Sequence, residues 1–468
     1  MHTSLQADLQ SFEDILRQTQ AYASSFLHEI NGTAPGLTVP ALPLDDLPTD
    51  GGGFAEALRL FQEKYRSWIT AAAGPRYFGF VTGGVTPASL AGDWLTSTFD
   101  QNATNSGASA ATLVEQETIH MLRQLLGLPD SFFGAFVTGA TMSNFVGLAL
   151  GRQWVGRQAG IDVAAEGLCR LTDIAVLSGT IHASAVKSLS MLGLGRNSWA
   201  PVSTLPGREA IDVTELDNAG TVNTVDFDDI AAIIRLRNKY PFWLHVDAAF
   251  GGFAACSDAY RHLLTGWQQA DSITIDAHKW LNVPYDSAMI FTRHPALQLA
   301  AFQNTNARYL TDPLGDFNYL NYTPENSRRL RALPAWFSLK AYGQAGYQSI
   351  IETNVALARQ LGKFVENTEA FRLLAPVRLC VVCFTLTVPE PDSLATLVDQ
   401  LLKRLNENGK VVLTATVYQG IPAIRAALVN WRTTAKDIEI TIEELLYALA
   451  QINQEIVPNQ TAMNQPKK

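Results

Sequence analysis

The sequence has few of the features that mark secreted, membrane-spanning or nucleic-acid-binding proteins. Only four of its 468 residues are cysteines (Cys169, Cys256, Cys380 and Cys383), too few for a disulfide framework in a chain of this length. No apolar run reaches the roughly 20 residues of a membrane span, and the acidic, amphipathic N-terminus does not follow the pattern of a signal peptide. A net charge of −9 without a basic stripe argues against a nucleic-acid partner. We therefore expect a cytoplasmic protein.

The composition is that of a globular protein with a large core. Apolar residues make up 47% of the chain and charged residues 17%, and the length suits two or three domains. Cys380 and Cys383 form a C-x-x-C within the strand-like run "LCVVCFTLTV", but no second pair or histidine ligand accompanies them. We interpret them as core cysteines rather than as a metal or redox site.

The hydrophobic pattern divides the chain into three regions. Residues 1–72 contain two helical stretches joined by a linker rich in Pro and Gly. In residues 73–347, short apolar runs alternate with helical stretches, which predicts an α/β domain with a mostly parallel central sheet and helices on both faces. Residues 348–468 are predicted to form a smaller α+β domain with a disordered tail.

The first helical stretch carries an apolar stripe, formed by Leu5, Leu9, Phe12 and Leu16. Their spacings of four, three and four residues place them on one face of a helix. Such a stripe must be buried, either against this chain or against a second subunit.

Two polar residues at the ends of strand-like runs are the most informative pair. Lys279 follows "SITIDAH" and Asp247 follows "FWLHV". In parallel sheets, ligands bind beyond the carboxyl ends of the strands. Pyridoxal phosphate (PLP) requires a lysine that forms a Schiff base with its aldehyde and a carboxylate that keeps its pyridine nitrogen protonated. The pair therefore predicts a PLP site, whereas the alternatives are a solvated lysine and an aspartate that caps a helix.

The phosphate of PLP needs an anion site, and one strand-to-helix junction offers it. Gly139, Ala140 and Thr141 lie where the strand-like "GAFVT" meets a helical stretch, and Ser143 and Asn144 add polar side chains. Backbone N–H groups at a helix N-terminus favour an anion, although the same pattern also marks an ordinary helix cap.

Three further residues could take part in the chemistry. His182, in "SGTIHASAVKS", follows a strand-like run and could stack on the pyridine ring, or simply pack in the core. The segment from Tyr309 to Arg329 reads as a long polar loop, and such loops often cover active sites. Tyr319 and Tyr322 within it are candidate proton donors or packing residues.

Together these motifs resemble the group II PLP-dependent decarboxylases, the family of aromatic-L-amino-acid and glutamate decarboxylases, and in particular its bacterial aromatic-type branch. The matching pieces occur in the family's order between about residue 50 and about residue 455. They are "TGATMSN", "HASAVKS", "AGTVNT", "HVDAAFGG" and "DAHKWLNVPYDSA". The resemblance implies a type I PLP-dependent transferase fold and a homodimer with the active site at the subunit interface. The implied activity is decarboxylation of an L-amino acid, with aromatic substrates favoured, to the primary amine and carbon dioxide.

The resemblance also assigns roles by matched position. Lys279 would be the Schiff-base lysine, Asp247 the partner of the pyridine nitrogen, and His182 the histidine that stacks on the ring. Tyr319 would match the family's mobile-loop tyrosine, which returns a proton to the substrate carbon, a role that His182 could share. The remaining matched positions line the cofactor or the substrate: Ala140, Thr141 and His278 at the phosphate, Ala249 against the ring, and Phe80, Val81 and Thr82 in the substrate pocket.

One segment is shorter than the family pattern. Gly207 and Arg208 lead through "EAIDVTELDN" almost directly into "AGTVNT", so about one helix and one core strand are absent before Thr221. A crossover between parallel strands takes at least ~10–12 residues, so a trimmed loop does not explain the difference. Either "AIDVTEL" takes the vacant place, or the protein is an inactive dimeric homologue.

The sequence leaves other activities open as well. They are decarboxylation of glutamate or another acidic amino acid, aldehyde synthesis, and other reactions of type I PLP enzymes. Tyr319 argues against aldehyde synthesis, because phenylalanine at the loop position would favour that reaction.

Overall fold

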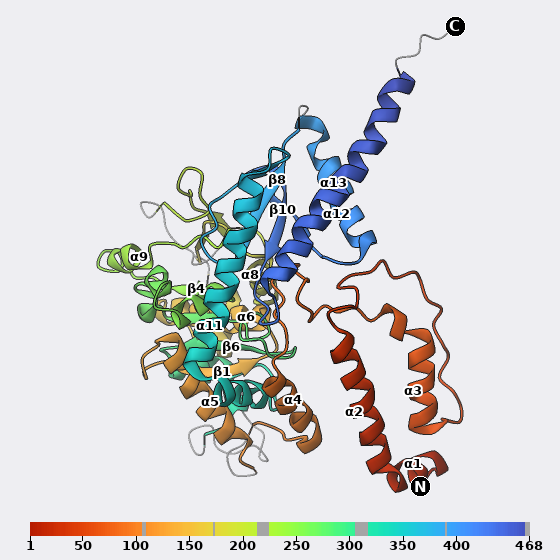
Figure 1. Ribbon diagram of the computed structural model, residues 1–468. Helices are drawn as coiled ribbons and strands as arrows, with labels where there is room; N and C mark the ends of the chain where they lie inside the picture. Colours follow the sequence, from red (N-terminus) through yellow and green to blue (C-terminus); the bar gives the residue numbers. More distant parts are fainter. Residues whose placement is uncertain (105–108, 172–173, 213–223, 305–316, 389–390, 464–468) are drawn as a thin grey trace.

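The computed structural model describes all residues except 105–108, 172–173, 213–223, 305–316, 389–390 and 464–468 (Figure 1). An arm of N-terminal helices lies beside a large α/β part and a smaller α+β part. None of the described helices is long and apolar enough to cross a membrane.

The described elements follow one another in the order that the hydrophobic pattern predicts. The helices of the arm and of the large part are α1 Thr3–Gln10, α2 Phe12–Glu29, α3 Gly53–Lys64, α4 Pro87–Phe99, α5 Ala111–Leu126, α6 Ala140–Gln158, α7 Val163–Glu166, α8 Ala183–Met191, α9 Ile230–Leu236 and α10 Pro295–Phe302. The strands of the large part are β1 Phe133–Val137, β2 Val176–Ser178, β3 Trp199–Pro201, β4 His245–Asp247, β5 Ser272–Ile275 and β6 Ala288–Thr292. The remaining elements are α11 Ala332–Glu366, β7 Phe371–Leu373, β8 Val381–Leu386, α12 Leu394–Asn408, β9 Thr414–Tyr418, β10 Ile421–Ala427 and α13 Ala435–Met463.

A four-stranded sheet with the order β1-β6-β5-β4 forms the centre of the large part. β4 runs parallel to β5, whereas β6 is antiparallel to both of its neighbours, β1 and β5. Three of these strands therefore share one direction, so that β4 and β5 end at the same edge, and β6 alone is reversed.

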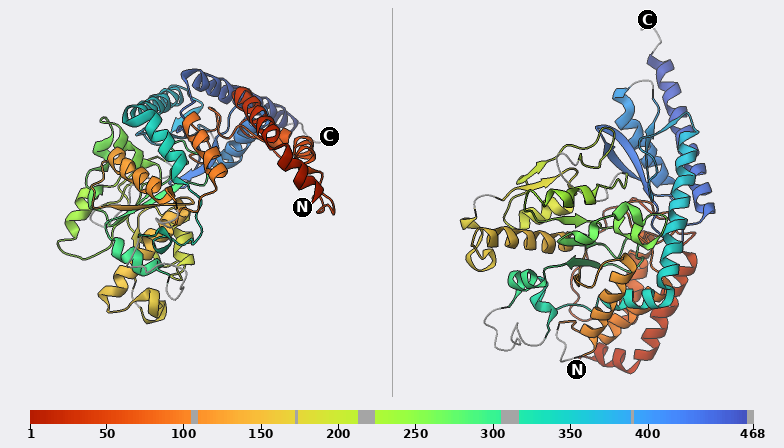
Figure 2. Two further views of the ribbon diagram at one scale, coloured as in Figure 1. Left: turned by 90° about the horizontal axis from the view of Figure 1, so that it is seen from below. Right: turned by 90° about the vertical axis from the view of Figure 1, so that its left-hand side faces the viewer.

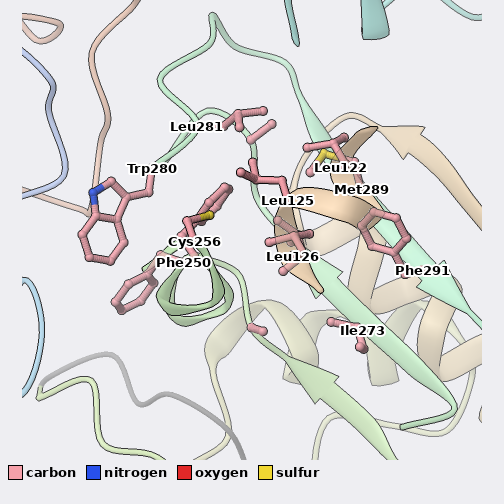
Figure 3. Close-up of a cluster of buried hydrophobic side chains, with 14 of the residues drawn as sticks. Leu122, Leu125, Leu126, Phe250, Cys256, Ile273, Trp280, Leu281, Met289 and Phe291 are labelled. Atoms are coloured by element: carbon pink, nitrogen blue, oxygen red, sulfur yellow. The ribbon is translucent and has the colours of Figure 1, made fainter. Parts of the chain in front are cut away.

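Alternate residues of these strands face two helical layers, as the pleat of a strand requires. Ala135 of β1 and Ile290 of β6 pack with Val146 of α6 on one face. Phe136 and Phe291, one position further along each strand, pack instead in the larger core. Figure 3 shows that core, in which leucines of α5 lie beside Ile273, Met289 and Phe291.

The central sheet is interrupted, which differs from the single continuous sheet expected for the large domain. β2 and β3 pair in parallel with each other and form a separate two-stranded sheet. Among the described residues, no strand pairs with the outer edge of β4. This finding agrees with the shortened segment before Thr221. Residues 213–223 of that segment lie outside the described residues. Ala210 and Ile211, the first residues of "AIDVTEL", are buried, and Ile211 forms an isolated bridge with Thr204.

The C-terminal part has the α+β character expected from the sequence. Its antiparallel sheet has the order β7-β8-β10-β9, and α12 and α13 pack with it around an apolar core. The proposed boundary between residues 347 and 348 lies within α11, which is kinked at Gly343 (φ 56°) and joins both parts. The last helix continues to Met463, beyond Ile456 where the pattern suggested its end. Cys380 and Cys383 are both buried.

The N-terminal arm differs from the expected single helix, because the chain breaks at Ser11 into α1 and α2. The apolar stripe is consequently shared between two helices, and no residue of α1, α2 or α3 is buried. The four side chains of the stripe are between 55% and 63% exposed. Both views of Figure 2 show the arm at the margin of the molecule.

A buried ion pair connects three segments of the large part. Arg328 donates hydrogen bonds from its guanidinium to both carboxylate oxygens of Glu115 in α5, at 2.8 and 3.1 Å, and to the carbonyl of Phe136 in β1. The amide of Phe136 in turn donates to Glu115. Both charged side chains are fully buried, so neither has water as a substitute partner.

Replacing Glu115 by Gln is therefore expected to destabilise the protein strongly, because it leaves the Arg328 guanidinium buried without a counter-charge. The expected loss is about 3–5 kcal/mol in the free energy of unfolding, visible as a fall of several degrees in the midpoint of thermal unfolding. Glu117→Gln is the matched control, because Glu117 lies two residues further along α5 and its side chain is exposed. This variant should leave the midpoint nearly unchanged. Equal midpoints for the two variants would contradict the assignment.

Candidate active site

Lys279 and Asp247 lie at one end of a cavity of about 420 Å³. Asp247 is the last residue of β4, and Lys279 follows β5 by a few residues of tight turn. Because β4 and β5 are parallel, their carboxyl ends meet at the same edge of the sheet. His182, Ala140 and Ala249 line the same cavity. The structure thus brings together five residues that the sequence assigned to the cofactor.

The carboxylate of Asp247 is fixed in orientation by two donors. The side-chain amide of Asn144 in α6 donates to Oδ2 at 2.8 Å, and the backbone amide of Ala249 donates to Oδ1 at 3.2 Å. Asn144 also donates to the hydroxyl of Ser184 at 3.0 Å. The aspartate is therefore held in place before any ligand arrives.

The ring of His182 is oriented by Ser184 at the start of α8. The backbone amide of Ser184 donates to Nδ1 of His182 at 3.2 Å, and the Ser184 hydroxyl lies 2.6 Å from the same nitrogen. Desolvation by the surrounding protein lowers the pKa of His182, with Lys279 and Arg425 acting in the same direction and Asp247 opposing them. The ring is thus neutral at pH 7, and since Nδ1 accepts a hydrogen bond, the proton is on Nε2.

Beside Lys279 lie two further titratable groups, Asp276 and His278. The Lys279 ammonium is 3.4 Å from Oδ2 of Asp276, and Nδ1 of His278 is 3.1 Å from Oδ1. Burial raises the pKa of Asp276 to about 6, although Lys279 opposes the shift. Burial lowers the pKa of His278 to about 4, so its imidazole is neutral at pH 7. Nδ1 of His278 and Oδ1 of Asp276 are buried without a hydrogen bond to any described residue.

The N-terminus of α6 supplies the anion site that the sequence predicts. No side-chain hydrogen bond caps this helix, which begins at Ala140. A Cβ atom placed on Gly139, just before the helix, would lie 3.9 Å from Cε1 of the His278 ring. Ser143, which the sequence also marked, donates instead to the carbonyl of Met289 in β6.

The residues present fit PLP on four counts. An amine, a carboxylate with a fixed orientation and a neutral imidazole face one cavity, and an uncapped helix N-terminus lies at its edge. The unpartnered Nδ1 of His278 at the same edge is a buried polar atom that a bound phosphate could satisfy. Ala249 has a side chain small enough for a flat ring to lie against it.

The strip Phe80–Thr82 lies directly against the lysine segment. The amide of Gly83 donates to the carbonyl of His278 at 3.2 Å, and a Cβ at Gly83 would be 1.8 Å from the carbonyl oxygen of Lys279. Phe80 and Val81 both have a left-handed backbone, with φ of 54° and 58°, a strain that concentrates at functional sites. The Phe80 side chain is 70% exposed. The strip lies beside the backbone of Lys279, but none of its three residues lines the cavity of about 420 Å³.

Tyr319 and Tyr322 are not brought to this cavity. Tyr319 is 1% exposed and packs against Phe133, Phe317 and the guanidinium of Arg328, and burial raises its pKa well above its usual value. Tyr322 lies in the same aromatic cluster. The first half of the predicted loop, residues 309–316, lies outside the described residues. A catalytic role for Tyr319 stays a prediction.

Three residues of the site were not assigned a function from the sequence: Asp276, Asn144 and His245. Asn144 was marked only as a polar residue near the phosphate, yet it bonds to Asp247. His245 lies two residues before Asp247, and its Nε2 is 2.9 Å from the side-chain oxygen of Asn144. Asp276 directly follows the apolar run "SITI", and this position could have marked it as a site residue, because a buried charge requires a partner.

Fold and site together define a PLP-dependent enzyme of the type I fold. Residues 210–387 match the profile of the pyridoxal-dependent decarboxylase conserved domain. The chain is 28% identical to the aromatic-L-amino-acid decarboxylase of Bacillus atrophaeus over 84% of its own length and 85% of the relative's, and 26% identical to the phenylacetaldehyde synthase of a Rosa hybrid cultivar over 86% of each. The crystal structure of Oryza sativa TDC with PLP and tryptamine superposes with a TM-score of 0.88 at 22% identity, covering 95% of this chain and 98% of that one. Residues 210–387 thus carry a pyridoxal-dependent decarboxylase domain, and the chain is similar over most of its length to PLP-dependent amino-acid decarboxylases.

The raised pKa of Asp276 predicts a pH-dependent gain from the variant Asp276→Asn in the apoprotein. The folded pKa of about 6 lies above the reference value of 3.8, so the wild type loses stability as the pH rises through this window. The asparagine variant escapes that loss and should gain up to roughly 3 kcal/mol relative to wild type between about pH 4 and pH 7.

Chemical denaturation of both apoproteins at several pH values measures this difference. Asp258→Asn is the control, because its side chain is 78% exposed. If the free energies of unfolding of Asp276→Asn and wild type differ by the same amount at every pH, burial does not oppose ionisation of the Asp276 carboxyl group.

Proposed function

We propose that the protein decarboxylates an aromatic L-amino acid to the corresponding primary amine, in a homodimer that contributes both subunits to each site. The observation that carries the proposal is the convergence of Lys279, an oriented Asp247 and a neutral His182 on one cavity. The names of the curated relatives, among them tryptophan decarboxylase of Camptotheca acuminata and tyrosine decarboxylase of Petroselinum crispum, support the aromatic substrate.

When bound, PLP supplies an electron sink for the electron pair released at Cα as carbon dioxide leaves. Lys279 would hold the cofactor through its Nζ. The fixed carboxylate of Asp247 would pair with the ring nitrogen and favour its protonated form. Asn144 prevents that carboxylate from turning away.

His182 has two tasks in the proposed reaction. Its ring and Ala249 line the same cavity, where both would lie against the cofactor and exclude water. The proton on Nε2 could bind the substrate carboxylate and could be donated to the substrate carbon. Tyr319 remains a candidate for the same proton transfer, which would require it to leave the aromatic cluster in which the structure places it.

We place the substrate side chain against the strip Phe80–Thr82. Phe80 exposes most of its ring next to the lysine segment, and Trp94 of α4 is also substantially exposed. Both rings would stack on an aromatic substrate at a completed subunit interface. An acidic substrate would instead require a cation here, and none lies in this strip.

The homodimer is supported by the N-terminal arm. Four apolar side chains on two consecutive helices remain exposed, which is unfavourable in water. A second subunit that covers them would remove this cost. A cytoplasmic location belongs to the same proposal, since the four cysteines are all unpaired.

The proposed activity is measured as carbon dioxide and amine released from L-tryptophan, L-tyrosine, L-phenylalanine and L-glutamate. We expect turnover of an aromatic substrate, and a loss of at least about 1,000-fold in kcat for Lys279→Ala, because no other amine can hold the cofactor. Lys187→Ala, at an exposed position of α8, is the control and should retain the wild-type rate. Preference for glutamate, or an aldehyde in place of the amine, would contradict the proposal.

The dimer is tested by replacing all four residues of the apolar stripe by serine. Light scattering should show a dimer for the wild type and a shift toward monomer for this variant, with activity falling in parallel because each site needs both subunits. Serine at the exposed positions Gln6, Gln10 and Gln18 is the control and should leave the dimer intact. A wild-type monomer with full activity would overturn the interface site.

A further inference from the structure

The interruption of the central sheet leaves an apolar chamber between β2 and β4. It is the part of the 420 Å³ cavity that extends away from Lys279 and Asp247, and α6 forms its floor. Its walls come from four segments, represented by Leu148, Val155, Val176, Leu189 and Phe242. The outer edges of β2 and β4 have no strand partner among the described residues.

No described residue of the shortened segment fills this chamber. Asp212, the last described residue before it, donates its amide to the carbonyl of Ser203 at 3.0 Å. Thr224, the first described residue after it, donates its hydroxyl to Glu209 at 2.8 Å. None of these four residues lines the cavity.

A single guanidinium, that of Arg152 in α6, lies in the apolar wall away from the cofactor end. Its Nη1 donates to the carbonyl of Leu192 at 2.8 Å, and its Nε has no hydrogen-bond partner among the described residues. No carboxylate of the described residues forms an ion pair with it. Burial lowers its pKa without a compensating acidic neighbour, yet an arginine stays charged at neutral pH.

Arg152 is partly buried and has no carboxylate partner among the described residues, so its guanidinium is a suitable contact for an anionic ligand. The planar fork of a guanidinium matches a carboxylate, with which it forms two parallel hydrogen bonds. The rest of the lining is mostly apolar, and Ser178 and Thr180 are among its polar residues. The volume of about 420 Å³ is that of the whole cavity, cofactor end included.

We propose that the chamber is a second ligand site, which binds a small monocarboxylate with an apolar body. The carboxylate pairs with Arg152, and the apolar body replaces the contacts that a core strand would make with α6.

The test uses the PLP-loaded protein, so that the cofactor end of the cavity is filled, and octanoate as the probe. Calorimetric titration should show saturable binding of octanoate, and 1-octanol, which has the same chain without a charge, should bind at least about tenfold more weakly. Arg152→Met should weaken octanoate binding about 10- to 100-fold, whereas Arg152→Lys should restore part of it.

Arg157→Met is the matched control, since Arg157 lies on the same helix but is exposed outside the cavity, and it should bind octanoate like the wild type. Should Arg152→Met fail to fold, the octanoate–octanol comparison and Arg152→Lys decide the question. Absence of octanoate binding would overturn the proposal. Equal affinities for octanoate and octanol would overturn the role of Arg152. Neither result bears on the decarboxylation assay.

Discussion

The side-chain amide of Asn144 uses its full hydrogen-bonding capacity to join four elements around the cofactor site. Its two N–H groups donate to Asp247 and Ser184, and its oxygen accepts from Thr274 and contacts Nε2 of His245. The amide is completely buried, so each of these bonds would be costly to lose. β4 is thereby tied to α6, to α8 and to β5, although no strand among the described residues pairs with its outer edge.

This arrangement explains how an interrupted sheet can keep a complete cofactor site. The groups that face the cofactor come from the end of β4, the turn after β5, and the first residues of α6 and α8. None of them comes from the place between β2 and β4. Among the described residues, no strand pairs with the outer edge of β4, and the cofactor-facing groups named above do not depend on one. The result is a chamber beside the cofactor site.

Much of the site could be predicted from the sequence, because its residues stand directly after apolar strand-like runs or at a strand-to-helix junction. Lys279, Asp247, His182 and Ala140 converge as the parallel arrangement of β4 and β5 requires. The antiparallel direction of β6 and the break of the arm helix at Ser11 were not predictable, because periodicity shows neither strand direction nor how neighbouring helices pack. The roles of Asn144 and Asp276 depend on side-chain contacts between distant segments, which no local pattern reveals. The position of Tyr319 in the sequence matches a loop tyrosine, yet its side chain packs in a buried aromatic cluster, because a matched position does not determine where a side chain packs.

The central claim is that the interrupted sheet still presents Lys279 to PLP. The most direct measurement is reduction of the PLP-loaded protein with borohydride, followed by peptide mapping of the phosphopyridoxyl label. The account predicts about one label per chain, located on the peptide that contains Lys279. A protein without label, or with label spread over exposed lysines such as Lys187, would show that the cofactor site does not function.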